Sequence, residues 1–244
     1  MKHAILSIGA LLVSASLALA AAPGAVTKTA SSERSQPAEN DYDYEPPYIG
    51  LAAKLGTLGP GLEATIGIIE WLNLRAGANY FRLRHGGAVS DVDYNFDIKL
   101  AAAPLLADWH PFANEFRVSG GLIYNRNQVD LGATPNKNTK IGGIDFTPEQ
   151  IGELSGSAQF KHFAPYFGLG YGNAVLDAEK TWGFVFDIGI IWQGSPEVEL
   201  SANGGMADNP IFQTALAQEE SDIQDDADVF RIYPVIAFGI SYQF

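Results

Sequence analysis

The amino-acid sequence predicts an all-β fold, a transmembrane antiparallel up-and-down β-barrel of eight strands with a short helix in the last long loop. The segment Phe230 to Phe244 is apolar or aromatic at every second position and ends on an aromatic residue. A period of two indicates a strand with one apolar face. Seven earlier segments alternate in the same way. Beyond the amino-terminal region the sequence has no run of about 18 consecutive apolar residues, so no spanning helix is predicted.

The amino terminus has the pattern of an export signal. A short basic start precedes the apolar stretch Ala4 to Leu19, and Ala18 and Ala20 fit an A-x-A cleavage site. We therefore expect three parts, namely a signal peptide at 1–20, a flexible periplasmic segment at 21–47 and an outer-membrane β-barrel at 48–244. Cysteine is absent, which excludes disulfide bonds and thiol-ligated metal.

The first three strands are predicted at 48–56, 61–69 and 72–84. Each has apolar side chains on one face and polar or small ones on the other. The polar faces carry Lys54, Glu63 and Arg75. The connections, 57–60 and 70–73, are short turns rich in Gly, Pro or Asn.

The fourth strand, 92–106, alternates most cleanly. Its predicted lipid-facing side chains are Val92, Tyr94, Phe96, Ile98, Leu100, Ala102, Pro104 and Leu106. Its other face carries Asp97 and Lys99. A turn then leads to a fifth strand at 115–131, on which Arg117 points inward.

The last three strands are predicted at 157–171, 182–192 and 230–244. The seventh and eighth strands place Asp187 and Arg231 on the inward face, against outward aromatic and branched residues. Because eight is an even number, both ends of the chain emerge on the same side of the membrane.

Besides Asn173 to Lys180, which joins the sixth strand to the seventh, three connections are longer than a tight turn. Residues 85–90 form a loop, and residues 132–156 form a long polar loop with one helical turn near Thr147 and Gln150, which have capping-box spacing. The longest connection, 194–229, contains a helix-like acidic stretch, Asn209 to Asp228. Long loops are extracellular in barrels of this kind and short turns are periplasmic. Both termini are therefore expected in the periplasm.

One alternative to this strand count remains open. The short alternating piece Val198 to Ala202 has the pattern of a strand. If it belonged to the barrel, the first two predicted strands would have to merge to keep the number even. Since the merged version would place the long loop 132–156 in the periplasm, we prefer the simple count.

The inward faces predict a network of charges inside the barrel. Its members carry both signs, and they are Lys54, Glu63, Arg75, Asp97, Lys99, Arg117, Asp187 and Arg231. Charges in so narrow a space must be paired or hydrated. Because eight strands enclose little more than their own side chains, we expect a filled lumen in preference to an aqueous pore.

Aromatic residues fall near the predicted strand ends, where the two membrane interfaces would lie. The predicted girdle consists of Trp71, Trp109, Trp182, Trp192, Tyr242 and Phe244. We also expect Phe244 to act as an assembly signal that is recognised by the barrel-assembly machinery.

The acidic composition limits the partners that we expect. The formal net charge is −13, which disfavours nucleic acid. The expected partners are outer-membrane lipids and lipopolysaccharide, and the expected state is a monomer. The acidic run Glu219, Glu220, Asp222, Asp225, Asp226 and Asp228 lacks the order of a calcium loop, so we interpret it as a solvated helix face and expect no metal and no cofactor. Divalent ions that bridge it to lipopolysaccharide are the alternative.

Catalysis is a third hypothesis and has little support in the sequence. His85 and His162 would lie near the outer rim, with Asp91, Asp93, Ser157 and Glu153 as candidate partners. No spacing among them matches a known catalytic motif. His110 lies in a predicted periplasmic turn, where a structural role is expected. We therefore assign no catalytic residue.

Four segments resemble a family of small proteobacterial outer-membrane proteins. They are Gly50 to Gly59, Leu105 to Phe112, Ala164 to Gly170 and Tyr233 to Phe244. The resemblance implies the eight-stranded barrel of the OmpA membrane domain and of OmpW. It implies no substrate and no functional residue. The sequence thus predicts a non-enzymatic outer-membrane barrel with a structural or surface-interaction role. A narrow porin-like channel is the alternative, and a lipid-modifying enzyme is the third reading.

Overall fold

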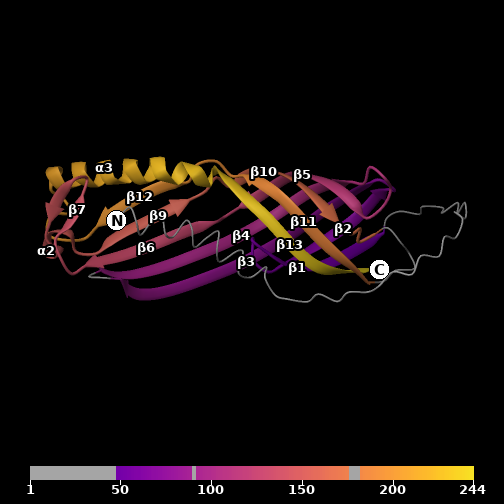
Figure 1. The fold of residues 1–244 in the computed structure, drawn as a ribbon, viewed down its shortest axis with the longest axis horizontal. Helices are drawn as coiled ribbons and strands as arrows, with labels where there is room; N and C mark the ends of the chain where they lie inside the picture. Colours follow the sequence, from indigo (N-terminus) through magenta and orange to yellow (C-terminus); the bar gives the residue numbers. More distant parts are fainter. Residues whose placement is uncertain (1–47, 90–91, 176–181) are drawn as a thin grey trace, which may run out of the picture.

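The computed structural model describes residues 48–89, 92–175 and 182–244. The predicted signal peptide and periplasmic segment lie outside the described residues, as does Asp91. Figure 1 shows two parts along the long axis, a closed barrel and an open sheet that extends from one rim of it. We call the open sheet and its helices the extension.

Eight strands close the barrel, as predicted. They are β1 (Ile49–Gly56), β2 (Gly61–Ile69), β3 (Leu72–Val89), β4 (Val92–Trp109), β5 (Phe116–Asn125), β10 (Phe163–Tyr171), β11 (Trp182–Trp192) and β13 (Ile232–Gln243). Every pairing is antiparallel, and β13 pairs with β1 with Tyr242 opposite Leu51. On the other side, β4 pairs with β5 to complete the ring, with Leu105 opposite Leu122. Closure leaves no unpaired edge around the ring.

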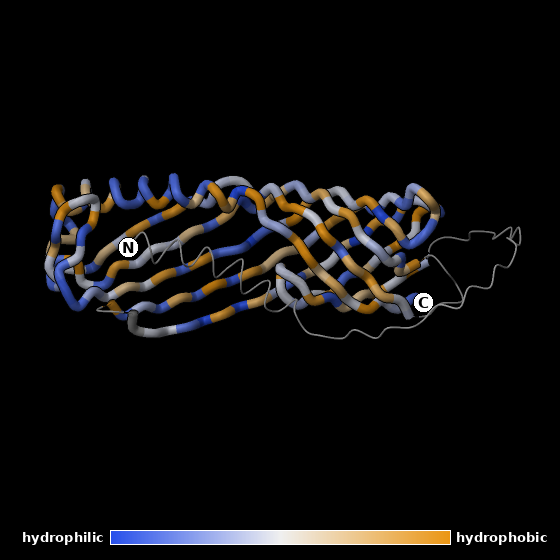
Figure 2. Tube along the Cα trace, viewed as in Figure 1, coloured by the Kyte–Doolittle hydropathy of each residue, from blue (hydrophilic) through white to orange (hydrophobic). Residues whose placement is uncertain are grey.

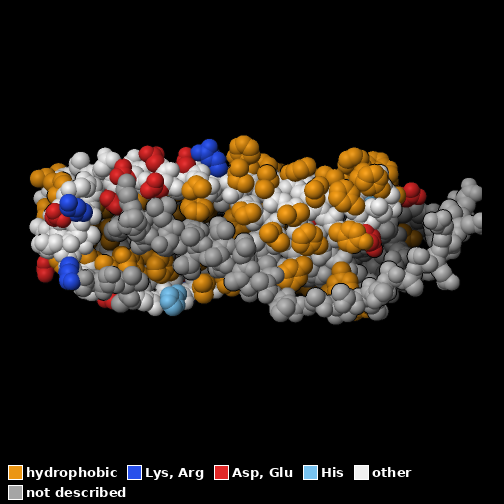
Figure 3. Space-filling view, in the orientation of Figure 1, with side chains coloured by type: hydrophobic (Ala, Val, Ile, Leu, Met, Phe, Trp, Pro, Cys, Tyr) orange, Lys and Arg blue, Asp and Glu red, His pale blue; other side chains and the backbone are white. Residues whose placement is uncertain are grey.

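The outer wall of the barrel is an apolar band. Leu62, Phe184 and Phe167 point outward with exposed fractions of 70%, 81% and 59%. Figure 2 shows hydrophobic residues recurring along the barrel strands, and Figure 3 shows apolar side chains gathered over the same part of the molecule. An exposed apolar surface of this extent is what lipid contact requires.

The extension continues β3 and β4 beyond the barrel. It adds β6 (Gln128–Pro135), β9 (Leu154–Gln159) and β12 (Glu197–Ala202) in the order β3-β4-β6-β9-β12. The piece 198–202 is therefore a strand, but it pairs with β9 in the extension and not in the barrel. The alternative in which the first two strands merge is wrong, because β1 and β2 are separate paired strands.

Helix α3 (Pro210–Ala227), the helix predicted for the last connection, lies along the free edge of the extension (Figure 1). The amide of Val198 donates to Gln224 Oε1 at 3.1 Å, and the amide of Leu200 donates to Glu220 Oε2 at 2.9 Å. These bonds occupy backbone groups that would otherwise be open to another strand. A short 3-10 helix, Asp228–Arg231, leads back to β13.

A small core closes the far end of the extension. It contains the hairpin β7 (Thr139–Ile141) and β8 (Ile144–Phe146) and the single-turn helix α2 (Pro148–Ile151). Phe212 of α3 packs edge-on against Phe146 with ring centroids 4.9 Å apart. The capping box predicted at α2 is present, with the Thr147 amide donating to Gln150 Oε1 at 2.8 Å.

Four predicted segments differ from the structure. Residues 85–89 belong to β3 instead of a loop, and the polar loop 132–156 holds the end of β6, the β7–β8 hairpin, α2 and the start of β9. The predicted strands 115–131 and 157–171 are each two strands, β5 with β6 and β9 with β10. One reason is Asn127, whose side-chain Oδ1 accepts from the Ala101 amide at 3.0 Å between the two partners of β4. β5 pairs with the barrel half of β4 and β6 with its extension half.

The predicted orientation of β4 is wrong. Leu100, Ala102 and Leu106 are buried and point inward, whereas Leu105 and Trp109 are exposed. The cause is that β4 crosses two environments. Its first half lies in the extension, where the outer face is polar and the inner face apolar, whereas in its second half both faces are apolar up to the inward Asp108.

Among the described residues, no helix is long and apolar enough to span a membrane.

Candidate functional site in the barrel lumen

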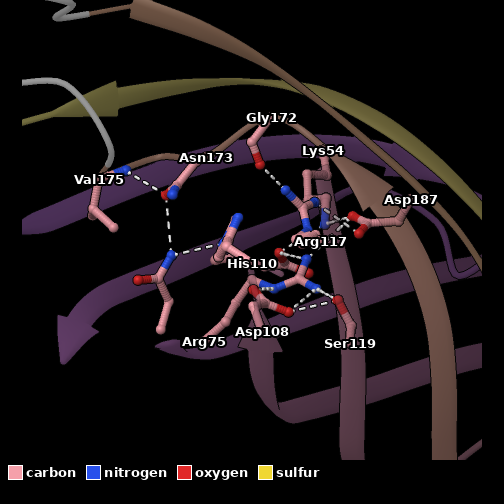
Figure 4. Close-up of polar contacts among 12 residues, drawn as sticks. Lys54, Arg75, Asp108, His110, Arg117, Ser119, Gly172, Asn173, Val175 and Asp187 are labelled. Carbon is pink, nitrogen blue, oxygen red and sulfur yellow. Dashed lines mark hydrogen bonds and ion pairs between the residues drawn. The ribbon is translucent and has the colours of Figure 1, made fainter. Parts of the chain in front are cut away.

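A layer of ion pairs lies inside the barrel, and Figure 4 shows its polar contacts. Lys54 of β1 donates to Glu63 Oε2 at 2.7 Å and also contacts Asp187. Arg75 of β3 reaches Glu63 at 2.9 Å and Asp187 at 3.1 Å. Arg117 of β5 donates to Asp187 Oδ1 at 2.7 Å. The five residues are buried, as alternation on their strands requires.

The sixth charge of this layer is Asp108, which sequence reasoning missed. Its Oδ2 lies 2.8 Å from Arg75 Nε, and its Oδ1 accepts from Ser119 Oγ at 2.6 Å. Three cations therefore face three carboxylates. The predicted fourth strand ended at Leu106, so Asp108 lay beyond it, and continuing the orientation assigned to that strand would have turned Asp108 towards lipid. Trp109 marks the end of the apolar band and points outward. Because neighbouring residues on a strand point to opposite faces, Asp108 could have been placed inward from this alone.

Two glycines make room for the ion pairs. A Cβ at Gly170 would lie 2.6 Å from Arg117 Nε and 2.8 Å from Asp187 Oδ1. A Cβ at Gly77 would lie 2.5 Å from Glu63 Cγ. All three distances are too short for a Cβ atom, so the ion-pair layer requires glycine at these two positions.

Three residues assigned to the lumen network lie elsewhere. Asp97 points outward from β4 and pairs with Arg82 at 2.5 Å and with Arg84 at 3.0 Å. Lys99 is the cross-strand partner of Arg82 on the same outer face. Arg231 precedes β13 and pairs with Asp228 at 2.7 Å. Asp97 and Lys99 were misplaced with the rest of β4, and Arg231 because the last strand begins only at Ile232.

A neutral polar layer lies below the ion pairs, at the rim where β3 begins. Asn73 Nδ2 contacts His110 Nε2 at 3.1 Å and donates to Asn173 Oδ1 at 3.0 Å. His110 Nδ1 lies 2.8 Å from the Asn114 carbonyl. An amide donor at Nε2 requires that nitrogen to accept, so Nδ1 carries the proton and donates. Burial lowers the pKa of His110 below its ordinary value, in agreement with a neutral ring.

An apolar layer lies above the ion pairs. Its members are Leu58, Ala102, Leu106, Ile123, Ala164, Tyr166, Ile191 and Val235. Leu58 comes from the β1–β2 turn and is buried because Thr57 is tied to β13, with Thr57 Oγ1 donating to the Pro234 carbonyl at 3.0 Å. Above this layer Asn125 Nδ2 donates to Gln193 Oε1 at 3.0 Å. A cavity of about 30 Å³ remains between the ionic and apolar layers, which is room for about one water molecule.

Five of the six predicted girdle residues lie at the rim that carries the chain ends of the barrel. Trp71 and Trp109 lie at the β2–β3 turn and the end of β4, and Tyr242 stacks edge-on with Trp182 and Phe244 at centroid distances of 4.9 and 5.0 Å. Trp192 lies at the opposite rim. Tyr80, Tyr124 and Phe163 are exposed near that rim, and the sequence interpretation did not include them.

His85 and Ser157 are not placed to act together in catalysis, and Asp91 lies outside the described part of the chain. His85, Glu153 and Ser157 all line a cavity of about 800 Å³ on the extension. However, His85 is in register with Phe96 and Leu131, whereas Ser157 is in register with Asp130 in the adjacent row. Adjacent rows point to opposite faces of a sheet, so the two side chains cannot share a proton. His162 instead lies against Tyr124 with ring centroids 5.8 Å apart, and Asp93 is exposed.

The acidic run is partly used for backbone contacts. Glu219 is buried and accepts from the Gly142 amide at 3.1 Å, while Glu220 accepts from Leu200. Asp228 pairs with Arg231. Within the described ranges, no group of three or more His, Asp or Glu side chains could hold a metal ion.

No protein-family model matches the chain, and no curated protein matches it. The chain is similar to several solved structures, among them two from Acinetobacter baumannii. The crystal structure of Acinetobacter baumannii CarO2 aligns with a TM-score of 0.56 and 23% identity, over 82% of this chain and 100% of that one. The likeness is one of fold. A. baumannii CarO aligns with a TM-score of 0.52 and 22% identity, over 80% of this chain and 97% of that one. The finer resemblance to the OmpA membrane domain and OmpW stays a prediction.

Proposed function

We propose that this protein is an outer-membrane barrel whose lumen is closed by its own side chains, with a structural or surface-interaction role. The observation that carries the proposal is the stacking of the layers. Neutral polar, ionic, apolar and again polar side chains follow one another along the lumen, and the cavity between two of them has about 30 Å³. A solute would have to break three buried cation–carboxylate sets and displace Leu106, Ile123 and Tyr166 to pass.

The proposed orientation places both ends of the barrel sequence in the periplasm. β1 begins and β13 ends at the same rim, with Gly50 opposite Gln243. At that rim β2 and β3 are joined by the two-residue turn Glu70–Trp71. The extension rises from the opposite rim and carries the longest connections. Short turns in the periplasm and long loops outside the cell are the rule for such barrels.

Planar-bilayer recordings of the refolded protein test this proposal. Each preparation is first checked on unheated gels for the migration of a folded barrel. The wild type should give no unitary current, because the ionic and apolar layers of described side chains fill the lumen. The variant Arg75→Ala/Ile123→Ala/Tyr166→Ala removes a cation from the ionic layer and two large side chains from the apolar layer, and it should conduct.

The matched control is Leu122→Ala/Phe167→Ala, which removes apolar side chains of the same two strands from the outward face. This control should stay silent. Discrete unitary currents from the wild type would overturn the proposal and favour a narrow channel. The enzyme hypothesis has no supporting geometry, since His85 and Ser157 point to opposite faces of the extension.

A further inference from the structure

Six basic residues are distributed around the rim where the barrel meets the extension, on β3 and β4 and in the connections next to other strands. We name them the basic collar, and they are Arg82, Arg84, Lys99, Arg126, Lys161 and Arg231. The other Lys and Arg residues of the described ranges are the three in the lumen and Lys137 and Lys140 near the β7–β8 hairpin. At the opposite rim, the described turns 70–71 and 110–115 contain Glu70 and Glu115 and no Lys or Arg. Among the described residues, the exposed Lys and Arg side chains are thus all on the extension side of the apolar band.

The register places the collar directly above the band. Tyr80 and Ala101 form the last outward pair of β3 and β4 without charge, and Arg82 lies opposite Lys99 in the next outward pair. The Arg126 amide donates to the Ala101 carbonyl at 2.8 Å, so Arg126 lies beside this pair.

Two further collar residues, Arg231 and Lys161, lie near the end of β11. The Arg231 carbonyl accepts from the Gln193 and Gly194 amides at the end of β11. A Cβ at Gly194 would lie 3.4 Å from Lys161 Cδ. Arg231 and Lys161 therefore approach the same turn.

The cations of the collar are only partly neutralised. Asp97 accepts from both Arg82 and Arg84, and Asp228 pairs with Arg231. The nearby Asp130 accepts from Gln128 Nε2 at 2.9 Å. Lys99 faces Arg82 across the strands and, among the described residues, pairs with no carboxylate. Like charges directly opposite each other destabilise a sheet, so an anion at this position would relieve a conflict that the chain itself leaves in place.

We propose that the basic collar binds the phosphate groups of an anionic lipid whose acyl chains lie along the apolar band. This inference rests on the proposed insertion in the outer membrane. The partner must be amphipathic because the cations border the apolar surface without a gap: Tyr80 and Arg82 are outward neighbours on one strand. Lys99 and Arg82 form the centre of the surface, and Arg126 and Lys161 extend it around the rim.

Native mass spectrometry of the folded barrel in detergent tests the proposal, with bis-phosphorylated lipid A and dephosphorylated lipid A as probes. The wild type should retain the phosphorylated lipid and lose the dephosphorylated one. Lys99→Gln should weaken retention about fivefold, as expected when one cation next to an anionic headgroup is lost. Arg126→Gln/Lys161→Gln should weaken it further, and Lys99→Arg should restore it.

Lys140→Gln is the matched control, because it removes the same charge from the exposed β7 strand far from the collar. Equal loss in this control, or equal retention of both lipids by the wild type, would overturn the proposal. Failure of the membrane proposal is distinguishable, since it would appear as loss of the folded, heat-modifiable band before any lipid is added. Conductance is measured separately and does not bear on lipid retention.

Discussion

Arg75 Nη1 lies 3.1 Å from Asp187 Oδ2 inside the barrel, although the two residues are 112 positions apart in the sequence. The same carboxylate contacts Lys54, and its other oxygen accepts from Arg117. One side chain of β11 therefore joins cations from β1, β3 and β5. The ion pairs link strands on different sides of the lumen, which the ladder bonds between neighbouring strands cannot do.

We expect Asp187→Asn to destabilise the barrel by about 3–5 kcal/mol, because it leaves three buried cations with two carboxylates. Urea unfolding in lipid vesicles, followed by tryptophan fluorescence, measures the loss. Asp93→Asn, an exposed carboxylate of the extension, should change the unfolding free energy by less than about 0.5 kcal/mol. A similar small effect for both variants would show that the ion pairs do not stabilise the fold.

Acidification should loosen the rim that contains His110. Its pKa is lowered in the folded state by burial, so the unfolded chain binds the proton more readily. The stability from the neutral ring is complete above about pH 6.5 and falls as the pH drops below that value. Protonation would also place an N–H of the ring against Asn73 Nδ2.

Comparing unfolding free energies at about pH 8 and about pH 5.5 measures this dependence. His110→Asn should remove part of the difference, whereas His85→Gln, an exposed histidine of the extension, should leave it unchanged. An unaltered difference in the His110 variant would contradict the assignment.

Glu220→Ala/Gln224→Ala should expose the edge of the extension. The amides of Val198 and Leu200 lose their acceptors, and an uncovered edge opens more readily and pairs with other chains. Hydrogen exchange of these two amides should accelerate, and the protein should form more oligomers on storage. Asp225→Ala/Asp226→Ala on the exposed side of the same helix serves as the control.

Phe244→Ser should lower the yield of assembled barrel more than it changes the properties of barrels that do assemble. The Phe244 amide donates to the Ile49 carbonyl at 3.0 Å, and its exposed ring packs on Tyr242. The heat-modifiable fraction in isolated outer membranes measures assembly. Phe112→Ser, which removes another exposed aromatic ring near the same rim, should assemble normally. Equal yields would mean that Phe244 is not recognised during assembly.

The barrel strands were predictable wherever one face meets lipid and the other the lumen. In β2 and β11 the outward-facing positions are apolar along the whole strand. Ile66 and Phe186 were therefore placed outward from the alternation alone. β4 defeats the same reasoning because its outer face is polar in the first half and apolar in the second, and because both faces of residues 100–107 are apolar. Which face of β4 points inward depends on the strands that pair with each of its halves.

The sequence by itself determined the number of barrel strands, the closed antiparallel fold and five of the six charges of the ionic layer. Period-two alternation is a local property, and a barrel wall imposes it on each strand separately. The tertiary structure decided what is not local. It brought Asp108 to Arg75, turned Asp97 and Lys99 outward to the rim, and collected β6, β9 and β12 into an extension beside β4. These arrangements follow from strand register and from the height of each residue relative to the apolar band, and neither is encoded in a single segment.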